Sequence, residues 1–407
     1  MDDRWGDNSL KLDASRVIDR NVYVDPAILE AENARIFART WQWVAHTSEI
    51  PEFGDYVTAT VAGRSVVIAR HDDGSVRAFF NTCTHRGAIL AEKAKGKCDG
   101  SFVCLYHGWC FDTSGKLTAV PLPDAYPEKL TKNPCYDIPN VRCEIMGDHI
   151  FVCLDKDAPS LEEFLGPSFE HIAFATRDGV ALGRVRWVID GNWKLWHENF
   201  RDNYHPMFAH QILGLNYQGV QLEGENYDLS LGHSLLTFPS QGNPKNIVNT
   251  MSRLTGRPLQ RKDADVLGRS AGGLTERPRH SILAIFPNLD FQYSTHPEAS
   301  TFLQTVRPVG LDKAVVEIVV FGEKGDTPEQ RKRRLECALD TQTAAGKVSG
   351  DDNEAARRCG IGFSTVNEVR WSNMDRGQAP GTMGGKNDEY SLRAFYEIYK
   401  SYMGDAL

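Results

Sequence analysis

Two short stretches of the sequence, CTHRG and CLYHG, each bring a cysteine and a histidine close together. Cys83 lies two positions before His85, and after eighteen further residues Cys104 lies three positions before His107. Two thiols and two imidazoles can meet around one metal centre only if these stretches form neighbouring loops of one small domain. This requirement restricts the fold more than any other feature of the chain.

The mixed make-up of each pair indicates an iron-sulfur cluster. Two cysteines and two histidines can hold a 2Fe-2S cluster with one iron on sulfur and the other on nitrogen, and neutral imidazoles raise its reduction potential to roughly −150 to +300 mV. Zinc is the main alternative, although structural zinc sites favour C-x2-4-C and H-x3-5-H pairs that join like with like. Ordinary burial of all four residues is a third interpretation. We expect the other cysteines to be reduced core thiols: Cys98, Cys110, Cys135, Cys143, Cys153, Cys337 and Cys359.

The chain around these motifs predicts a small antiparallel β domain. Runs rich in β-branched and aromatic residues cover Tyr56–Val61, Ser65–Arg70 and Val76–Asn81, and another follows at Asp148–Leu154. Turn sequences such as Ala-Gly and Asp-Asp-Gly separate the first three runs. Several short strands at close spacing fit a single core of about 120 residues. We therefore place this domain at residues 38–160.

The rest of the chain predicts an α+β domain at residues 161–407, in which helices flank an antiparallel sheet. Residues 1–37 are expected to pack on it as an N-terminal segment. The runs that predict strands in this domain are 183–190, 281–286, 301–308 and 314–322.

Three helices are predicted by their periodicity and end signals. One starts after Asn192, a candidate N-cap, and is expected to kink at Pro206. A second begins near Thr327 and ends at the acidic stretch SGDDN. The last covers Ser391–Met403, with an apolar face at helical spacing. The polar residues 239–276 are expected to form a long excursion between elements.

Charge and hydropathy exclude several classes of partner. The chain has 46 Lys and Arg against 54 Asp and Glu, a formal net charge of −8, with no polybasic run. Nucleic acid and anionic membranes are therefore poor partners. No apolar run reaches about 18 residues, and the polar, acidic N-terminus differs from a signal peptide. We expect a cytoplasmic protein.

A second candidate metal site lies in the stretch HENFRDNYHPMFAH, where His205 and His210 are five positions apart. Two imidazoles and one carboxylate form the facial arrangement of non-heme iron(II) oxygenases, which leaves positions for dioxygen and substrate. On a regular helix this spacing turns the rings apart, so a local distortion is required. The carboxylate must come from elsewhere, and Asp351 and Asp352 are the candidates. The plainer interpretations are ordinary histidines and a solvated acidic turn.

Both sites together resemble those of the aromatic ring-hydroxylating oxygenases. CTHRG with CLYHGW is similar to the Rieske signature of that family, and NWKLWHENFRDNYHPMFAH is similar to the NWK…EN…D-x-Y-H-x4-H segment of its α subunits. The resemblance implies a small all-β Rieske 2Fe-2S domain and a helix-grip-like catalytic domain with one mononuclear Fe(II). It implies that His205, His210 and Asp352, the second acidic residue of a D-D-N motif, bind this iron.

The resemblance also implies an electron path and a reaction. Asp202 would bridge to His107 of the partner subunit, and Asn199 would lie near the iron without firmly binding it. Electrons would come from NAD(P)H through a ferredoxin or reductase. The α subunits would form a head-to-tail trimer, with or without β subunits. The expected reaction is hydroxylation of an aromatic compound with O2, as a cis-dihydroxylation, and an aromatic acid is one candidate substrate.

Candidate pocket residues lie beside the predicted iron ligands or on a predicted strand. Most are apolar, as an aromatic substrate prefers, although each is explained equally well by core packing. An aromatic acid would need an arginine for its carboxylate, and Arg307 and Arg393 are candidates. The pocket candidates other than Asn199 are Met207, Phe208, Leu213, His280 and Ile282.

Two other functions are compatible with the motifs. A Rieske monooxygenase or demethylase that acts on a methoxy-aromatic compound or a quaternary amine would share every metal ligand and differ in its pocket. A Rieske electron-transfer protein without oxygenase activity needs only the first domain, so the length of chain beyond residue 160 disfavours it.

Overall fold

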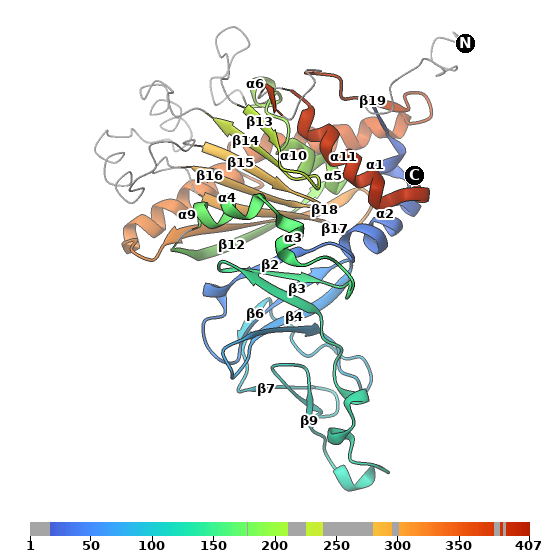
Figure 1. Ribbon diagram of the computed structural model, residues 1–407, viewed down its shortest axis with the longest axis vertical. Coiled ribbons are helices and arrows are strands. Elements are labelled where there is room, and N and C mark those ends of the chain that lie inside the picture. Colours follow the sequence, from blue (N-terminus) through green and yellow to red (C-terminus); the bar gives the residue numbers. More distant parts are fainter. Residues whose placement is uncertain are drawn as a thin grey trace. The chain divides into compact units, whose positions relative to one another are not determined.

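The computed structural model describes residues 17–176, 178–210, 225–238, 280–294, 301–377, 383–385 and 388–407. The chain divides into two compact units (Figure 1). The smaller unit, called here the Rieske-motif unit because it holds CTHRG and CLYHG, is Glu32–Phe164. The larger is called here the catalytic unit, after the catalytic domain expected in this part of the sequence, and it combines the chain up to Ala31 with Leu165–Leu407. The sequence placed the corresponding boundaries after residues 37 and 160.

Three antiparallel sheets of short strands form the described Rieske-motif unit, with the orders β5-β4-β3-β6, β7-β8-β9 and β10-β11-β2. The strands predicted from the β-branched runs are present as β3, β4, β5 and β11. The strands are β2 (Gln42–His46), β3 (Asp55–Val61), β4 (Arg64–Arg70), β5 (Val76–Phe80), β6 (Lys95–Lys97), β7 (Ser101–Val103), β8 (Cys110–Asp112), β9 (Leu117–Ala119), β10 (Arg142–Met146) and β11 (His149–Cys153).

Short helical turns connect these strands. The predicted Ala-Gly turn between β3 and β4 has both residues in the left-handed region, with φ of 47° at Ala62 and 73° at Gly63, which matches the twist of the hairpin. The helical segments are η1 (Asn33–Phe37), η2 (Thr47–Glu49), η3 (Pro123–Ala125), η4 (Leu130–Lys132), η5 (Pro134–Tyr136) and, across the division between the units, α2 (Pro26–Glu32) and α3 (Leu161–Leu165).

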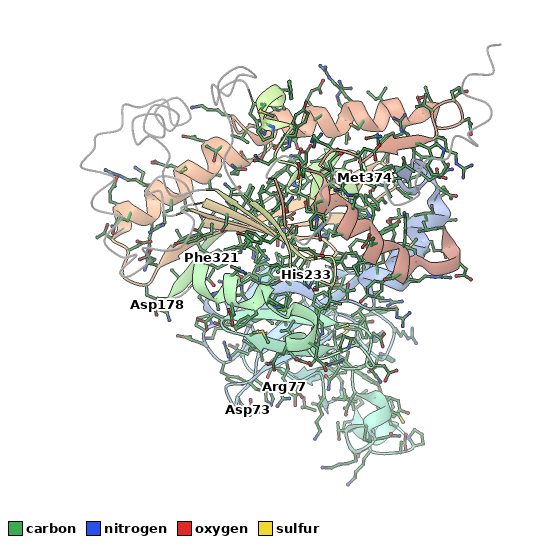
Figure 2. All side chains as sticks on the ribbon, turned by 45° about the horizontal axis from the view of Figure 1, so that its top comes forward. Asp73, Arg77, Asp178, His233, Phe321 and Met374 are labelled. Atoms are coloured by element: carbon green, nitrogen blue, oxygen red, sulfur yellow. The ribbon has the colours of Figure 1, made fainter. Side chains whose placement is uncertain are left out.

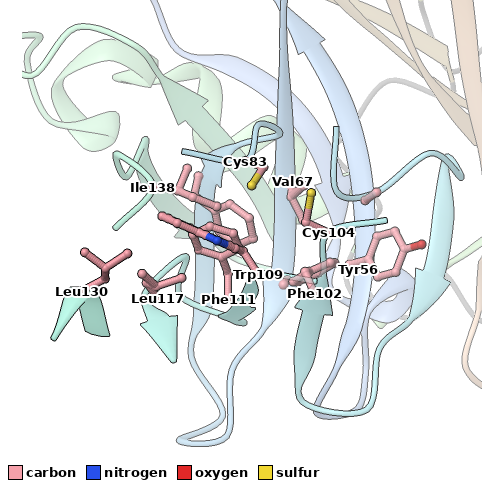
Figure 3. Close-up of a cluster of buried hydrophobic side chains, with 13 residues drawn as sticks. Tyr56, Val67, Cys83, Phe102, Cys104, Trp109, Phe111, Leu117, Leu130 and Ile138 are labelled. Atoms are coloured by element: carbon pink, nitrogen blue, oxygen red, sulfur yellow. The ribbon is translucent and has the colours of Figure 1, made fainter. Parts of the chain in front are cut away.

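A buried aromatic cluster lies directly beneath the cysteine motifs. Cys83 and Cys104 belong to it together with Trp109, Phe111 and Phe102. Figure 3 shows the two sulfur atoms at the edge of this cluster, with the aromatic rings below them. The core therefore fixes the base of both cysteine-bearing loops.

Eight described strands of the catalytic unit form one antiparallel sheet, in the order β12-β18-β17-β16-β15-β14-β13-β20 (Figure 1). The chain is α+β, as predicted, and the β-branched runs form its longest strands. A separate pair joins β1 (Val17–Asp19) to β19 (Trp371–Asn373). The sheet strands are β12 (Gly179–Asp190), β13 (Glu225–Asp228), β14 (Ser234–Phe238), β15 (His280–Ile285), β16 (Leu289–Ser294), β17 (Thr301–Pro308), β18 (Lys313–Glu323) and β20 (Met383–Gly385).

The helix predicted after Asn192 consists of two short helices. The Asn192 side chain caps α5 (Trp193–Asn199) as expected, but this helix already ends at Asn199. Asp202 Oδ1 accepts a hydrogen bond from the Tyr204 N–H at 2.8 Å and closes a local turn instead. Pro206, which was expected to kink the helix, is instead the first residue of the next helix, α6 (Pro206–Ala209). At this position an N–H would have no partner within the helix, so proline costs no hydrogen bond.

The helix predicted from Thr327 also ends early. Thr327 caps α9 (Pro328–Gln342), but Thr343 is extended and a separate helix, α10 (Ser349–Gly362), follows. The acidic pair of SGDDN therefore lies in the first turn of α10, where its charge is favourable. The prediction that this pair ends the preceding helix was wrong.

Helices of the larger unit pack on the sheet and on one another. α5 contacts β17 and β18, and α10 contacts both α5 and β12. The predicted last helix is α11 (Tyr390–Met403), which contacts β13 and buries its predicted apolar face, including Phe395 and Tyr399. The other helical segments of this unit are α1 (Asn21–Val24), α4 (Ser168–Ala175), η7 (Phe363–Thr365) and η8 (Gly404–Ala406). None of the described helices combines the length and apolar composition that a membrane span needs. The predicted excursion at 239–276 lies outside the described residues.

Candidate metal centres

The two cysteine-bearing loops of the Rieske-motif unit have the same backbone geometry. Gly87 N–H donates to Cys83 O at 2.8 Å, and Gly108 N–H donates to Cys104 O at 2.9 Å. Both glycines are in the left-handed region, with φ of 76° and 68°, which closes each loop tightly. Both thiols are buried, at 2% and 3% exposure. The matched loops thus present two sulfur atoms from equivalent positions.

The two histidines of these loops have one ring nitrogen each that is buried without a hydrogen-bond partner. These atoms are His85 Nδ1 and His107 Nδ1, and the two ring centroids are 4.5 Å apart. Trp109 stacks on His85 at 4.8 Å and holds its plane. A buried polar atom without a partner is costly, and a metal ion bound to both nitrogens removes that cost. The four residues therefore fit a 2Fe-2S cluster.

Burial governs the titration of these groups in the metal-free protein. Burial raises the pKa of the Cys83 thiol, and the neighbouring Cys104 thiol raises it further. Burial lowers the pKa of His85, as do His107 and Arg86. Without a metal the thiol is therefore held protonated and the imidazole neutral. Bound iron supplies the positive charge that stabilises the thiolate.

In the catalytic unit, His205 and His210 meet Asp352, as the sequence suggested. Asp352 Oδ1 lies 3.5 Å from His205 Nε2 and 3.2 Å from His210 Nε2. The potential ligand atoms all lie within 4.8 Å of one another. Asp352 Oδ1 is buried and makes no hydrogen bond of acceptable geometry. Three ligand atoms that face one another in this way leave a place for a cation, and the residues fit a mononuclear iron.

The second nitrogen of each ring is oriented by a neighbour. His205 Nδ1 lies 2.6 Å from the carbonyl oxygen of Asp202, so it donates to this acceptor. His210 Nδ1 lies 3.3 Å from Asp351 Oδ2. With a proton on each Nδ1, both Nε2 atoms present lone pairs to the centre. Asp351, one of two candidate carboxylates in the sequence, thus contacts a ligand ring from outside.

Charge at this site is strongly coupled. Burial of Asp352 favours its neutral form, but His205 and His210 outweigh burial and lower the pKa of the carboxyl to about 2. Burial alone would lower the pKa of His210, whereas Asp352 and Asp351 raise it. The metal-free site therefore holds an ionised carboxylate beside a readily protonated imidazole. A divalent cation replaces that proton.

Close packing of α10 brings Asp352 to the histidines. A Cβ built on Gly191, just before α5, would lie 3.2 Å from the Cβ of Ala356 in α10, so a larger residue there would separate these segments. Trp187 in β12 donates to Asn353 Oδ1 at 3.2 Å and fixes the same turn of α10. These contacts join residues far apart in sequence.

The structure locates the remaining predicted site residues only in part. Asn199 ends α5, and its backbone carbonyl accepts a hydrogen bond from Asp202 N–H at 3.3 Å. Met207 is half-buried and Phe208 is 49% exposed, both in α6. Ile282 is half-buried in β15. His280 begins β15, and Leu213 lies outside the described residues.

A partly buried cluster around Glu198 of α5 was not predicted from the sequence. Tyr23 donates to Glu198 Oε1 at 2.8 Å, Tyr396 donates to the same oxygen, and the two tyrosine hydroxyls are 2.8 Å apart. Burial raises the pKa of Glu198, although both tyrosines oppose this. Glu198 was visible within the HENFRD stretch, but its tyrosine partners lie at opposite ends of the chain.

A second missed network anchors α5 to the sheet. His197 Nδ1 lies 2.9 Å from Asp290 in β16, and Arg201 donates to His197 Nε2 at 3.1 Å. All three side chains are buried. The network fixes α5, the helix that precedes the turn with Asp202 and His205. Nothing in the local sequence links Asp290 to it.

The arginines considered for an aromatic acid have other surroundings. Arg393 in α11 donates to three backbone carbonyls, those of Met374, Arg376 and Gly377, at 2.6, 3.1 and 2.7 Å. Its role is therefore structural. Arg307 in β17 is half-buried, and burial lowers its pKa.

Comparisons with known proteins match one family model to each of the two units. The Rieske [2Fe-2S] domain family matches residues 40–137, and the ring-hydroxylating alpha subunit catalytic domain family matches residues 177–405. The large oxygenase component of the naphthalene 1,2-dioxygenase system of Pseudomonas putida is 31% identical, over 95% of this chain and 91% of that protein. Toluate 1,2-dioxygenase subunit alpha of Pseudomonas putida is 29% identical, over 85% of this chain and 78% of that protein.

A solved structure extends the similarity to the whole fold. The crystal structure of naphthalene 1,2-dioxygenase from Rhodococcus sp. bound to indole superposes with a TM-score of 0.79 and 25% identity, over 95% of this chain and 94% of that chain. Together with the two family matches, this identifies the chain as a member of the ring-hydroxylating oxygenase α subunits, oxidoreductases with a Rieske 2Fe-2S cluster and a mononuclear iron.

Proposed function

We propose that this chain is the terminal oxygenase component of a system that cis-dihydroxylates an aromatic compound with O2. Electrons come from NAD(P)H through a ferredoxin or reductase. The observation that carries the proposal is the convergence of His205 Nε2 and His210 Nε2 on the buried Asp352 Oδ1, at 3.5 and 3.2 Å. Iron held there supplies the activation of dioxygen, since this ligand set leaves coordination positions open.

In this proposal Cys83 and Cys104 bind one iron of the cluster, and His85 and His107 bind the other. The buried Nδ1 atoms of the two histidines support ligation through that nitrogen. Both rings are only half-buried, which leaves Nε2 for a partner. His205, His210 and Asp352 bind the mononuclear iron, and Asn199 lies close to it.

We further propose that electrons pass between subunits through Asp202, from His107 of the partner subunit. The Asp202 side chain is 25% exposed. Next to His107, the side chains of Leu105 and Tyr106 are 84% and 56% exposed, which suits a contact with another chain. Electron transfer from subunit to subunit closes into a ring, and we propose a trimer of α subunits, with or without β subunits.

The substrate pocket is proposed to lie beside α6 and β15. Met207, Phe208 and Ile282 supply apolar surface there, and Leu213 and His280 remain candidates from the same part of the chain. Such surface suits an aromatic ring. Because Arg393 is engaged by backbone carbonyls, Arg307 is the arginine left as a candidate partner for an aromatic acid.

We also propose that the chain is organised as an N-terminal segment at residues 1–37, a Rieske domain at 38–160 and a catalytic domain at 161–407. The proposed location is cytoplasmic.

Product analysis with isotopically labelled dioxygen tests the reaction. The enzyme, its electron donors and NAD(P)H are incubated with a panel that includes naphthalene, benzoate, toluate and anthranilate. We expect a cis-diol, or the catechol formed from it, in which both new oxygen atoms come from one dioxygen molecule. A product with only one labelled oxygen atom would show that the enzyme is a monooxygenase and would contradict the proposed dioxygenation.

The same experiment separates the rival functions when the panel includes methoxybenzoates and a quaternary amine. Formaldehyde from a methoxy compound would identify a demethylase. Reduction of the cluster without product from any compound, at full iron content, would favour an electron-transfer protein. Product from ring compounds alone supports the proposal.

A further inference from the structure

We propose that Arg376 is a positioning residue that holds the Asp202 carboxylate in place for electron transfer between the two metal centres. The inference rests on the bridging role proposed for Asp202 and assigns the residue that orients this bridge. It concerns a residue 174 positions away along the chain, for which the sequence carries no motif.

Direct contacts carry the inference. Arg376 Nη2 donates to Asp202 Oδ1 at 3.0 Å, and the same oxygen accepts the Tyr204 N–H at 2.8 Å. The guanidinium carbon lies 4.0 Å from the centroid of the Tyr204 ring. One arginine thus holds the carboxylate and covers the neighbouring ring, and both belong to the turn that leads into His205.

The loop that carries Arg376 is itself firmly attached. Glu389 Oε2 accepts from Arg376 N–H at 2.9 Å, and Glu389 Oε1 lies 3.4 Å from Arg376 Nη1. Glu389 N–H donates to Arg376 O at 2.9 Å, and Arg393 binds three carbonyls of the same loop, starting at the buried Met374 (Figure 2). An arginine anchored in this way is preorganised, unlike a flexible surface side chain.

The two oxygen atoms of the Asp202 carboxylate have different surroundings. Oδ1 takes the bonds from Arg376 and Tyr204, and within the described residues no hydrogen bond reaches Oδ2. A carboxylate fixed through one oxygen presents the other in a defined direction. Oδ2 is then the atom that can accept a hydrogen bond from a histidine of another subunit.

The backbone connects the same residue to the iron site. Asp202 O accepts from His205 Nδ1 at 2.6 Å, so Asp202 contacts an iron ligand through its carbonyl and Arg376 through its side chain. A shift of this residue therefore changes both ends of the proposed path. An ordinary exposed ion pair would affect neither end of this electron path and contributes little to the stability of the fold.

Single-turnover kinetics of the assembled holoenzyme test the inference. The reduced enzyme is mixed with O2 and the panel compound that it converts, and reoxidation of the cluster is followed by visible absorbance. We expect Arg376→Gln to slow reoxidation about tenfold with metal content and unfolding midpoint unchanged. Arg376→Lys, which keeps the charge and a donor nitrogen but loses the planar fork, should recover part of the rate.

A double-mutant cycle shows whether Arg376 acts through Asp202. If it does, Arg376→Gln changes the rate less than about twofold in an Asp202→Asn background. Arg370→Gln is the matched control, since Arg370 binds Asp19 at 2.7 Å and lies over the Trp371 ring at 5.0 Å, a similar pair of contacts away from the metal site. It should react at the wild-type rate.

The outcomes separate this inference from the proposed function. Slow transfer in Asp202→Asn with a wild-type rate in Arg376→Gln overturns the role of Arg376 alone. Wild-type rates in Asp202→Asn refute the bridge itself. Loss of iron or a lowered unfolding midpoint in Arg376→Gln, with equal slowing in both backgrounds, identifies a merely structural arginine and also overturns the inference.

Discussion

The two candidate metal centres are assembled in different ways. All four proposed cluster ligands lie on two matched loops between Cys83 and His107, above one aromatic core. The proposed iron ligands come from a turn after α5 and from α10, 142 positions apart between His210 and Asp352. The first site is a local property of one small domain. The second exists only when a helix packs correctly, so the two sites should respond differently to substitution.

The largest effect is expected for the local site. Cys104→Ser replaces a thiolate with a poor iron ligand, and we expect loss of the whole cluster, about two irons per chain, because three ligands hold it weakly. The mononuclear iron should remain. Visible absorption, EPR of the reduced protein and iron analysis measure this. Cys98→Ser, a half-buried thiol of the same unit, is the control and should keep all iron.

Asp352→Ala should have the opposite effect on the two metal centres. Removal of the buried carboxylate leaves two imidazoles as ligands, and we expect loss of the mononuclear iron and of turnover with an intact cluster. Glu354→Ala is the matched control, since Glu354 lies one half-turn further along α10 and pairs with exposed arginines. If Asp352→Ala retains iron and activity, Asp352 is the wrong ligand and the comparison between the sites loses its basis.

This difference explains how much the sequence could predict. Cys83, His85, Cys104 and His107 were recognisable because their spacing is short and each residue type is chemically distinctive. The β-branched runs likewise predicted β3, β4 and β5, whose partners are close in sequence. Local structure and local chemistry are the parts that a sequence pattern describes directly.

Non-local contacts were the part that the sequence could not predict. The family resemblance indicated Asp352 as the ligand, but nothing in the sequence showed that α10 packs against Gly191 or that Arg376 reaches Asp202 across 174 positions. The long helix predicted after Asn192 failed for a different, local reason: the Asp202 side chain accepts a hydrogen bond from Tyr204 N–H, and this turn competes with the helix. Such contacts leave no periodic signal.

Asp351→Asn gives a smaller effect that refines the comparison. The substitution weakens the acceptor for His210 Nδ1 without removing a ligand, so iron affinity at the catalytic site should fall about 10- to 100-fold with the cluster unaffected. Iron retention during dialysis against a graded chelator measures it. Unchanged retention would mean that the partly exposed Asp351 does not orient the ring.

The smallest effect concerns acid stability, where the Rieske-motif unit should be the weaker region. Burial, with a further contribution from His46, lowers the pKa of His149 in β11 to about 3, and its Nδ1 accepts a hydrogen bond from Trp43 Nε1 at 3.0 Å. In the catalytic unit burial also lowers the pKa of His197, but Asp290 opposes the shift. The unit with the uncompensated histidine should lose more stability in acid.

The sign follows from proton binding. Below about pH 6.5 His149 binds a proton in the unfolded chain but not in the folded unit. The free energy of unfolding therefore decreases as the pH is lowered, by at most about 1.4 kcal/mol per pH unit. His149→Gln keeps an acceptor for Trp43 and should remove this slope between pH 6.5 and 5. Urea titrations of the cluster absorbance at several pH values measure it. An unaltered slope in the variant would assign the acid sensitivity to other groups and leave the two units equal in this respect.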